Sequence, residues 1–333
     1  MHPSKGIHLI TLVTGATGLL GNNVVRLLLD RDQAVRVMVR KNSDPRPLEE
    51  LNVEVVYGDV REPLEVENAM RDIDVVIHCA AFIHFGWTKF DVSRAVNVEG
   101  TRHVAAAARA VGAKMIHVST CDTLASGKKN VPADEETPGE KVPCAYVVSK
   151  REAEEVVQQE IAIGLHAVIT NPTFMMGPWD WKPSSGRMIL ETVRRFTPIA
   201  PRGGLSICDV RDVAAGILAA VEKGQVGQRY ILSGENISYL DLWRLFARVA
   251  SGKGPLATLG PLLRFIVGRI GDLRGKLSRH EPEVNSASLR LASDYHYYTC
   301  ERAKQELGYA SRPKEESIEA EWKWLVDNGY AGP

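Results

Sequence analysis

The sequence lacks a net charge, a paired set of cysteines and any long hydrophobic run. Its 41 Lys and Arg residues balance its 41 Asp and Glu residues, so no overall field attracts nucleic acid or an anionic membrane. The five cysteines are odd in number, far apart and without a CxxC pair, which argues against a disulfide framework, a zinc site or a redox dithiol. No run approaches the roughly 20 apolar residues of a membrane-spanning helix. We therefore expect a cytoplasmic protein that holds no metal and binds no nucleic acid.

The amino terminus makes a poor signal peptide. Only Lys5 precedes an apolar run that passes straight into a glycine-rich turn. The 333 residues leave room for about two structural units with a sizeable core.

The glycine-rich turn follows an almost continuous apolar run, residues 8–13, and precedes a helical pattern that extends to about residue 30. This order suits a dinucleotide phosphate, because glycine lets the backbone approach the pyrophosphate and the helix start offers amide donors. The Gly-x-x-Gly-x-x-Gly spacing departs by one residue from the standard fingerprint, and a simple tight turn is the alternative. We expect cofactor contacts from six residues: Gly15, Thr17, Gly18, Leu19, Leu20 and Gly21.

Further strand-like segments alternate with helical ones. They are residues 34–39, 53–57, 75–79, 114–119 and 168–171. Such alternation predicts an α/β fold with a Rossmann-like, doubly wound parallel sheet. One predicted helix, at about 90–111, holds Gly100 in its interior. Because an interior Gly costs up to about 1 kcal/mol relative to Ala, we expect close packing at that point.

The carboxyl ends of parallel strands form the ligand-binding edge of such a sheet. The second strand ends at Arg40-Lys41, where folds that use NAD typically place an acidic residue on the ribose hydroxyls. A guanidinium suits a 2′-phosphate, so we favour NADP over NAD, with two solvated charges as the alternative. The cofactor is also expected to contact the residues after the third and fourth strands: Asp59, Val60, Ala80 and Ala81. For Asp59, a role as turn former or helix cap is the alternative.

The stretch Pro-Cys-Ala-Tyr-Val-Val-Ser-Lys, residues 143–150, places Tyr146 and Lys150 four residues apart. In a helix the two side chains share a face. A free Tyr titrates near ~10, and a neighbouring cation favours the phenolate, so the pair suits general acid/base catalysis. The alternative is an exposed helix on which the Lys merely covers apolar surface.

Several ordered motifs together resemble the extended short-chain dehydrogenases/reductases, in the branch of dihydroflavonol reductases, 3β-hydroxysteroid dehydrogenases and hopanoid-associated sugar epimerases. The motifs are Thr14 to Gly21, Asn97-Val98-Glu99-Gly100-Thr101, Val118-Ser119-Thr120, Tyr146 to Lys150, Asn171-Pro172 and Gly177 to Pro183. The resemblance covers nearly the whole chain. It implies a dinucleotide-binding domain of residues 1–171, to whose sheet 205–233 return, and a smaller mixed substrate lobe of residues 172–204 and 234–333.

The resemblance also implies a catalytic triad of Thr120, Tyr146 and Lys150. In the family, a Ser or Thr polarises the substrate carbonyl, the Tyr exchanges its proton, and the Lys lowers the Tyr pKa and holds the nicotinamide ribose. Ser119 and Cys121 compete with Thr120 for the first role. We favour Thr120, because Ser119 would point to the other side of an extended strand and Cys121 is a poor hydrogen-bond donor.

The second half of the chain is expected to line the nicotinamide and the substrate. By resemblance, Pro172 and Phe174 lie against the nicotinamide. The substrate pocket is expected to include His84, Met175, Met176 and Trp179. For the Met and aromatic residues, a place in the core is the alternative.

Residues 259–273 are strongly apolar but interrupted by Arg264, Arg269 and Asp272. This segment is too short and too charged to span a membrane. We favour a helix of the lobe over a subunit contact or a membrane-surface helix. A homodimer is expected only by analogy with the family.

These observations favour an NADP-dependent carbonyl reductase or alcohol dehydrogenase that acts on a ketone, aldehyde or secondary alcohol. The alternative is a nucleotide-sugar epimerase or dehydratase that retains its cofactor. Family dehydratases typically follow the catalytic Thr with Asp-Glu, whereas this chain has Cys121-Asp122. A third possibility is a dinucleotide-sensing protein without catalysis.

Overall fold

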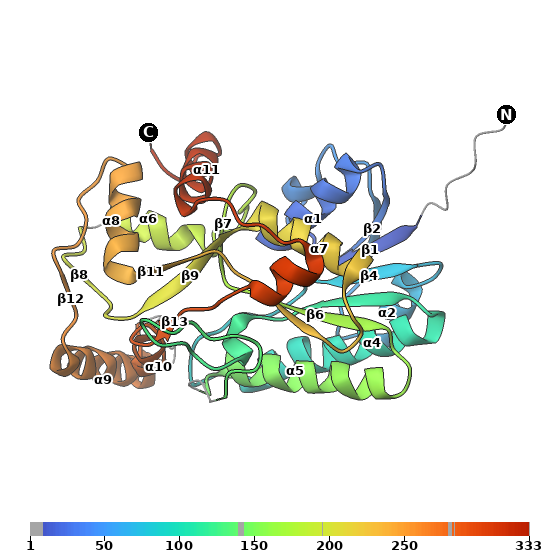
Figure 1. The fold of residues 1–333 in the computed structure, drawn as a ribbon, viewed down its shortest axis with the longest axis horizontal. Helices are drawn as coiled ribbons and strands as arrows, with labels where there is room; N and C mark the ends of the chain where they lie inside the picture. Colours follow the sequence, from blue (N-terminus) through green and yellow to red (C-terminus); the bar gives the residue numbers. More distant parts are fainter. Residues whose placement is uncertain (1–8, 139–142, 195, 279–281, 283, 333) are drawn as a thin grey trace.

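A seven-stranded parallel sheet with helices on both faces forms the larger part of the protein (Figure 1). In this computed structural model the described residues are 9–138, 143–194, 196–278, 282 and 284–332. The strand order is β10-β6-β5-β4-β1-β2-β3, and every neighbouring pair is parallel. The bounds are β1 Ile10–Thr14, β2 Ala34–Val39, β3 Glu54–Tyr57, β4 Val75–His78, β5 Lys114–Val118, β6 Ala167–Pro172 and β10 Arg229–Leu232. The Rossmann-like sheet predicted from the alternation is confirmed.

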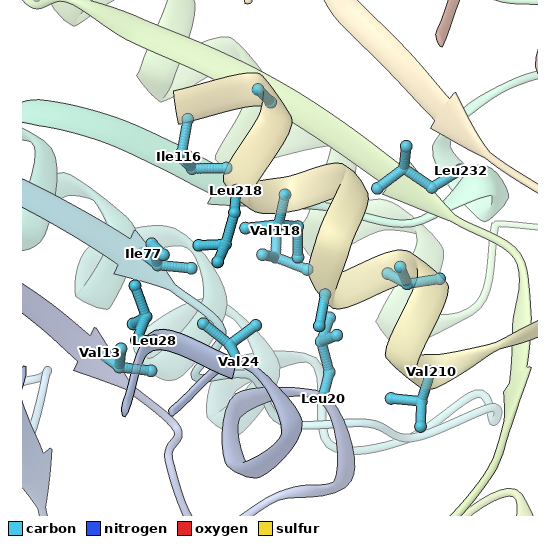
Figure 2. Close-up of a cluster of buried hydrophobic side chains, with 14 of the residues drawn as sticks. Val13, Leu20, Val24, Leu28, Ile77, Ile116, Val118, Val210, Leu218 and Leu232 are labelled. Atoms are coloured by element: carbon cyan, nitrogen blue, oxygen red, sulfur yellow. The ribbon is translucent and has the colours of Figure 1, made fainter. Parts of the chain in front are cut away.

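Two hydrophobic clusters cover the two faces of this sheet. Helices α1 (Leu19–Asp30) and α7 (Val210–Lys223) pack on one face, where their Leu and Val side chains meet those of β1, β4 and β5 (Figure 2). Helices α2 (Pro63–Ala69), α4 (Gly100–Val111) and α5 (Ala145–Ala162) cover the other face. Because both faces are covered, strands such as β4 and β6 are buried at every residue, which explains the apolar runs, residues 75–77 and 167–169, with which they begin.

A smaller lobe continues from the carboxyl end of β6. Its four-stranded sheet contains β7 Phe174–Met176, β9 Gly204–Asp209, β11 Glu235–Ser238 and β13 Tyr295–His296. Strands β8 Ile199–Ala200 and β12 Ala257–Thr258 form a separate pair. The lobe's helices are α6 Gly186–Arg194, α8 Tyr239–Val249, α9 Pro261–Ser278, α10 Ser286–Leu291 and α11 Lys314–Asp327. Side chains from α6, α8, α11 and this second sheet form a third hydrophobic cluster.

Two segments differ from the sequence expectations. Within residues 205–233, β10 joins the main sheet and α7 packs on it. Strand β9, however, pairs with β7, β11 and β13 in the lobe. The helix expected over about 90–111 is interrupted: α3 (Phe90–Ser93) leads into a π-helix at Arg94–Glu99 before α4 begins. The pairing of β9 has no local signature in the sequence, because it depends on which distant segments supply the partner strands.

Within the described ranges, no helix combines the length and the apolar character that crossing a membrane requires.

Candidate active site

The glycine turn between β1 and α1 has the backbone geometry of a phosphate cradle. Gly15 has a φ of +71°, and a Cβ there would stand 2.7 Å from the Ala80 nitrogen. A Cβ on Gly21 would collide with the Gly15 carbonyl. Gly18 precedes α1 with only one atom within 4 Å of a built Cβ, and no side chain caps this helix. The turn therefore leaves an exposed backbone and helix amides open to an anion, as a dinucleotide pyrophosphate requires.

The other residues expected around the cofactor lie along the same edge of the sheet. Leu19 and Leu20 are buried in the core, so only their backbone can contribute, and Thr17 is half-buried. At the end of β4, Ala80 is half-buried and Ala81 exposed. Val60 is buried against Gly100, where a Cβ would stand 2.8 Å from the Val60 methyl group. The predicted close packing at Gly100 is confirmed.

The basic tip of β2 stands beside an acidic turn. Arg40 is exposed, and its side chain makes no hydrogen bond or ion pair within the described part of the chain. The Asp59 carboxylate instead accepts from the Arg61 guanidinium at 2.7 Å and from the Arg61 backbone at 3.0 Å. This bonding, with a smaller contribution from Arg40, lowers the pKa of Asp59. Asp59 thus closes the turn after β3, the role that sequence reasoning left open, while the Arg40 side chain is available to a ligand.

Tyr146 lies in the first turn of α5, with its side chain buried against residues of the loop after β4. The Phe85 ring meets the Tyr146 ring edge-on at 5.0 Å between centroids, and the His84 carbonyl accepts from the Tyr146 backbone at 3.3 Å. The Thr120 side chain lies within hydrogen-bonding reach of the phenol. Burial, followed by the charge of Asp122, raises the pKa of Tyr146. The phenol is therefore protonated at neutral pH and suited to donating its proton.

Lys150 extends from the next turn of α5 and is almost completely buried. Its Nζ donates to the Val118 carbonyl at the end of β5, at 2.9 Å. Burial lowers the pKa of Lys150 to about 8, opposed by the charge of Glu154. Burial and Asp122 are the largest causes of the shift in the pKa of Tyr146, and the expected effect of Lys150 on the phenol stays a prediction.

The lowered pKa of Lys150 predicts a pH-dependent stability. Between pH 8 and pH 10.5 the unfolded chain binds this proton and the folded chain does not, so stability rises with pH in that window. A shift of this size corresponds to about 3 kcal/mol at most. We expect the free energy of unfolding of the cofactor-free protein to rise by up to that amount relative to Lys150→Met. Urea titrations at several pH values measure this. If the free energy of unfolding changed with pH in the same way in wild type and variant, the lowered pKa of the buried Lys150 amine would be contradicted.

Glu154, one further turn along α5, accepts hydrogen bonds from several polar groups near Thr120. Its carboxylate accepts from Ser119 at 2.5 Å, Thr123 at 2.7 Å, Asn171 at 2.9 Å and Arg229 at 2.8 Å. It thereby connects α5 to the ends of β5 and β6 and to the start of β10. Ser119 points away from the phenol, as expected for alternation along a strand, which leaves Thr120 as the hydroxyl beside Tyr146.

We expect Glu154→Gln to destabilise the protein by about 2 to 3 kcal/mol, because it removes the buried charge that four donors share. Glu160→Gln is the matched control on the same helix. Glu160 pairs with Arg109 at 2.8 Å in a more exposed position, so its loss should cost under about 1 kcal/mol. Urea unfolding measures both, and equal losses would show that the Glu154 network has no special weight.

A second structural network fixes the loop after β4. Asn97 bonds both backbone groups of Phe82, accepting at 2.7 Å and donating at 2.9 Å, and donates to Ser149 at 2.9 Å. All of its side-chain contacts are thus with the loop and with α5. The geometry favours a structural role for Asn97, which fixes the loop after β4 against α5.

Residues from the lobe approach the catalytic end of β5. The Tyr298 hydroxyl donates to the Cys121 carbonyl at 3.0 Å, and His296 Nδ1 lies 3.8 Å from the Asp122 carboxylate. Burial and then Asp122 raise the pKa of Tyr239. Sequence reasoning missed Tyr239, His296 and Tyr298; the only signal was the unusual run Tyr-His-Tyr-Tyr at 295–298. The site therefore lies between the sheet domain and the lobe.

A separate hollow of about 520 Å³ opens elsewhere on the lobe. Tyr295 and Tyr297 line it together with Arg202 and Lys129. Because alternate residues of an extended chain face opposite sides, these two tyrosines face away from His296 and Tyr298. Neither Tyr146 nor Thr120 lines this hollow.

The residues expected in the substrate pocket differ from one another in burial and in contacts. His84 lies beside Tyr146 through its backbone, and its Nε2 is 3.2 Å from the Thr88 hydroxyl. Met176 is fully buried in the lobe core, because β7 pairs with β9, and Trp179 lies with its ring 3.3 Å from the Arg26 guanidinium of α1. Met176 therefore matches the core alternative, whereas the half-buried Trp179 stays a predicted pocket residue. The rest of this segment comprises buried Pro172 and half-buried Phe174 and Met175.

Comparisons with known proteins agree with this geometry. The model of the NAD dependent epimerase/dehydratase family matches residues 11–233. A putative dihydroflavonol 4-reductase of Synechocystis sp. is 32% identical over 96% of this chain and 95% of its own length. The sterol demethylase protein B of Methylococcus capsulatus is 31% identical, covering 96% and 99%. The crystal structure of gox2253 superposes with a TM-score of 0.85 at 35% identity, covering 96% and 98%. The chain therefore belongs to the NAD dependent epimerase/dehydratase family, within the extended short-chain dehydrogenases/reductases.

Proposed function

We propose that the protein is an NADP-dependent carbonyl reductase or alcohol dehydrogenase that acts on a ketone, an aldehyde or a secondary alcohol. The observation that carries the proposal is the buried pair of Thr120, just after β5, and Tyr146, at the start of α5. The reductase name of one relative matched over nearly its whole length supports it.

The residues present fit a bound dinucleotide. The turn from Gly15 to Gly18 and the start of α1 would hold the pyrophosphate, and the exposed Arg40 would hold a 2′-phosphate. Lys150, at the base of the same cleft, would donate to a ribose hydroxyl. Bound NADPH would supply the hydride that the carbonyl carbon receives.

The chain's own groups would handle the developing charge and the proton. The Thr120 hydroxyl would donate a hydrogen bond to the carbonyl oxygen as negative charge accumulates there. Tyr146 would then give its phenolic proton to that oxygen. The raised pKa of Tyr146 keeps this proton in place at neutral pH until the oxygen becomes basic enough to take it. In the reverse direction the same two groups would bind and deprotonate a secondary alcohol.

A nucleotide sugar is less well supported, because the arginines that a diphosphate would need are spread and engaged. Arg211 pairs with Asp209 at 2.7 Å, and Arg194 donates to the Tyr330 carbonyl at 3.1 Å. Arg202 lines the separate hollow, and Arg195 lies outside the described residues. Among the described residues, Arg211 and Arg194 are therefore engaged with protein groups, and Arg202 lies in the separate hollow.

The test is a screen of NADPH oxidation over sterol ketones, flavonoid-like ketones, aromatic aldehydes and nucleotide sugars. We expect one NADPH consumed for each alcohol formed, with mass spectrometry identifying the product. Purification with tightly held dinucleotide, and turnover of a sugar without net NADPH consumption, would identify an epimerase instead. Binding of NADPH without turnover across the panel would favour the dinucleotide-sensing alternative.

A further inference from the structure

Helix α9 presents most of its large apolar side chains to solvent. Leu277 is 78% exposed, Leu262 74% and Phe265 65%. Four others on this helix are 44% exposed or more: Leu263, Ile266, Ile270 and Leu273. A surface helix of a globular protein normally turns such residues toward the core. Contiguous apolar patches of this kind mark interaction sites.

The inward face of α9 is made of glycine instead. A Cβ on Gly268 would stand 3.2 Å from the Ser286 Cα, and one on Gly271 would collide with the Val284 carbonyl. The Asp272 carboxylate accepts from the Ser286 backbone at 3.0 Å. At about 3.6 residues per turn, Gly268, Gly271 and Gly275 lie opposite the apolar row. The helix therefore lies closely against the start of α10 through small residues, which fixes the large ones outward.

The charges of α9 are strongly unbalanced although the whole chain is neutral. The helix holds four cations, Arg264, Arg269, Arg274 and Lys276, and one carboxylate, Asp272, which already bonds to the protein. At helical spacing Arg269 and Lys276 follow one edge of the apolar row, and Arg274 the other. Long basic side chains at the edge of an apolar face can extend toward anionic headgroups while the apolar face enters the acyl boundary.

A second copy of the chain would fit this face poorly. In a two-fold symmetric contact the same patch occurs on both partners. The cations beside one apolar row would then face those beside the other, and α9 itself holds a single carboxylate, Asp272, to offset the repulsion. An anionic bilayer surface complements both the apolar row and its basic edges.

The position of α9 connects this face with the candidate active site. Its neighbour α10 contributes Ala287 and Leu291 to the cluster that contains Tyr146, and Trp87 of the β4 loop donates to the Ser286 hydroxyl at 3.0 Å. Figure 1 shows α9 and α10 side by side at the outer end of the lobe. Docking through α9 would hold the catalytic cleft near the bilayer surface.

We propose that α9 docks the protein in the plane of an anionic lipid bilayer, with its row of exposed Leu, Ile and Phe side chains in the acyl boundary and its basic edges on the headgroups. This is an interfacial contact, which needs no spanning helix. It is independent of the substrate and of the catalytic proposal.

Vesicle flotation with the full chain tests the proposal. We expect the protein to float with vesicles of phosphatidylcholine containing roughly one third phosphatidylglycerol, and to bind pure phosphatidylcholine far more weakly. Ile270→Ser/Leu273→Ser should lower binding about tenfold or more. Arg269→Gln/Lys276→Gln should weaken binding to the anionic vesicles, and added salt should weaken wild-type binding.

Matched controls separate this face from general stickiness. Leu64→Ser/Ile163→Ser removes two apolar side chains, 76% and 62% exposed, from other parts of the surface. Arg102→Gln/Lys323→Gln removes two exposed cations away from α9. Both pairs should float like the wild type, and unchanged thermal unfolding should show that every variant is folded.

Three results would overturn the proposal. The first is failure of the wild type to float with anionic vesicles. The second is equal binding to charged and uncharged vesicles, or equal loss in the control pairs. The third is a dimer in sedimentation equilibrium that Ile270→Ser/Leu273→Ser dissociates, because the apolar row would then be a contact between copies of the chain. Turnover is not a readout, so failure here is distinguishable from failure of the catalytic proposal.

Discussion

The Tyr146→Phe variant is expected to lose about 10²- to 10⁴-fold in turnover while it binds NADPH as the wild type does. The change removes only the hydroxyl that stands beside Thr120, and leaves the ring to meet Phe85 as before. Steady-state kinetics on an active carbonyl substrate measures the loss, and fluorescence titration with NADPH measures binding. The effect should fall on kcat, because proton transfer occurs in the transition state and not on binding.

Tyr309→Phe is the matched control for this variant. Tyr309 is a buried tyrosine whose hydroxyl has no hydrogen-bond partner in the described part of the chain. Its removal should leave turnover unchanged. Near-normal turnover of Tyr146→Phe, or an equal loss in both variants, would contradict the proposed proton donor.

Charge reversal at Arg40 is expected to change the cofactor preference. Arg40→Asp should weaken NADPH binding by about 10- to 100-fold, because a charge-assisted contact with the 2′-phosphate is replaced by repulsion. Binding of NADH should change by less than about threefold, since an acidic residue at this strand end can accept from the ribose hydroxyls. Titration of both cofactors against the same preparations gives the ratio.

Arg248→Asp, a charge reversal at an exposed position of α8, serves as the control. It should change binding of both cofactors little, because α8 packs in the hydrophobic cluster of the lobe and not at the edge of the main sheet. Equal weakening of NADPH and NADH in Arg40→Asp would refute the assignment of Arg40 to the 2′-phosphate.

The fold class followed from local pattern alone. Strands buried on both faces are mostly apolar, and the helices between them carry one apolar face. The alternation of strands and helices can therefore be recognised from the hydrophobic pattern of the sequence. The glycine turn was equally readable, because Gly15 adopts a left-handed φ and Gly21 leaves no space for a side chain. The spacing of Tyr146 and Lys150 was local too, since residues four apart share a helix face.

Everything that depends on distant partners required the tertiary structure. The sequence marks Glu154 as one more acid on a helix, and only folding brings Ser119, Asn171 and Arg229 to it. Pairing of β7 with β9 turned Met176 into the lobe core, where its residue type alone left core and pocket equally open. In α9 the same period of apolar residues would suit a buried helix, but close contact of its glycines with α10 turned that face to solvent. The sequence by itself determined the sheet, the turn and the Tyr-Lys pair, because these are periodic or local. Which face of each element is buried was decided by the tertiary structure, because a face is buried only when another element packs against it.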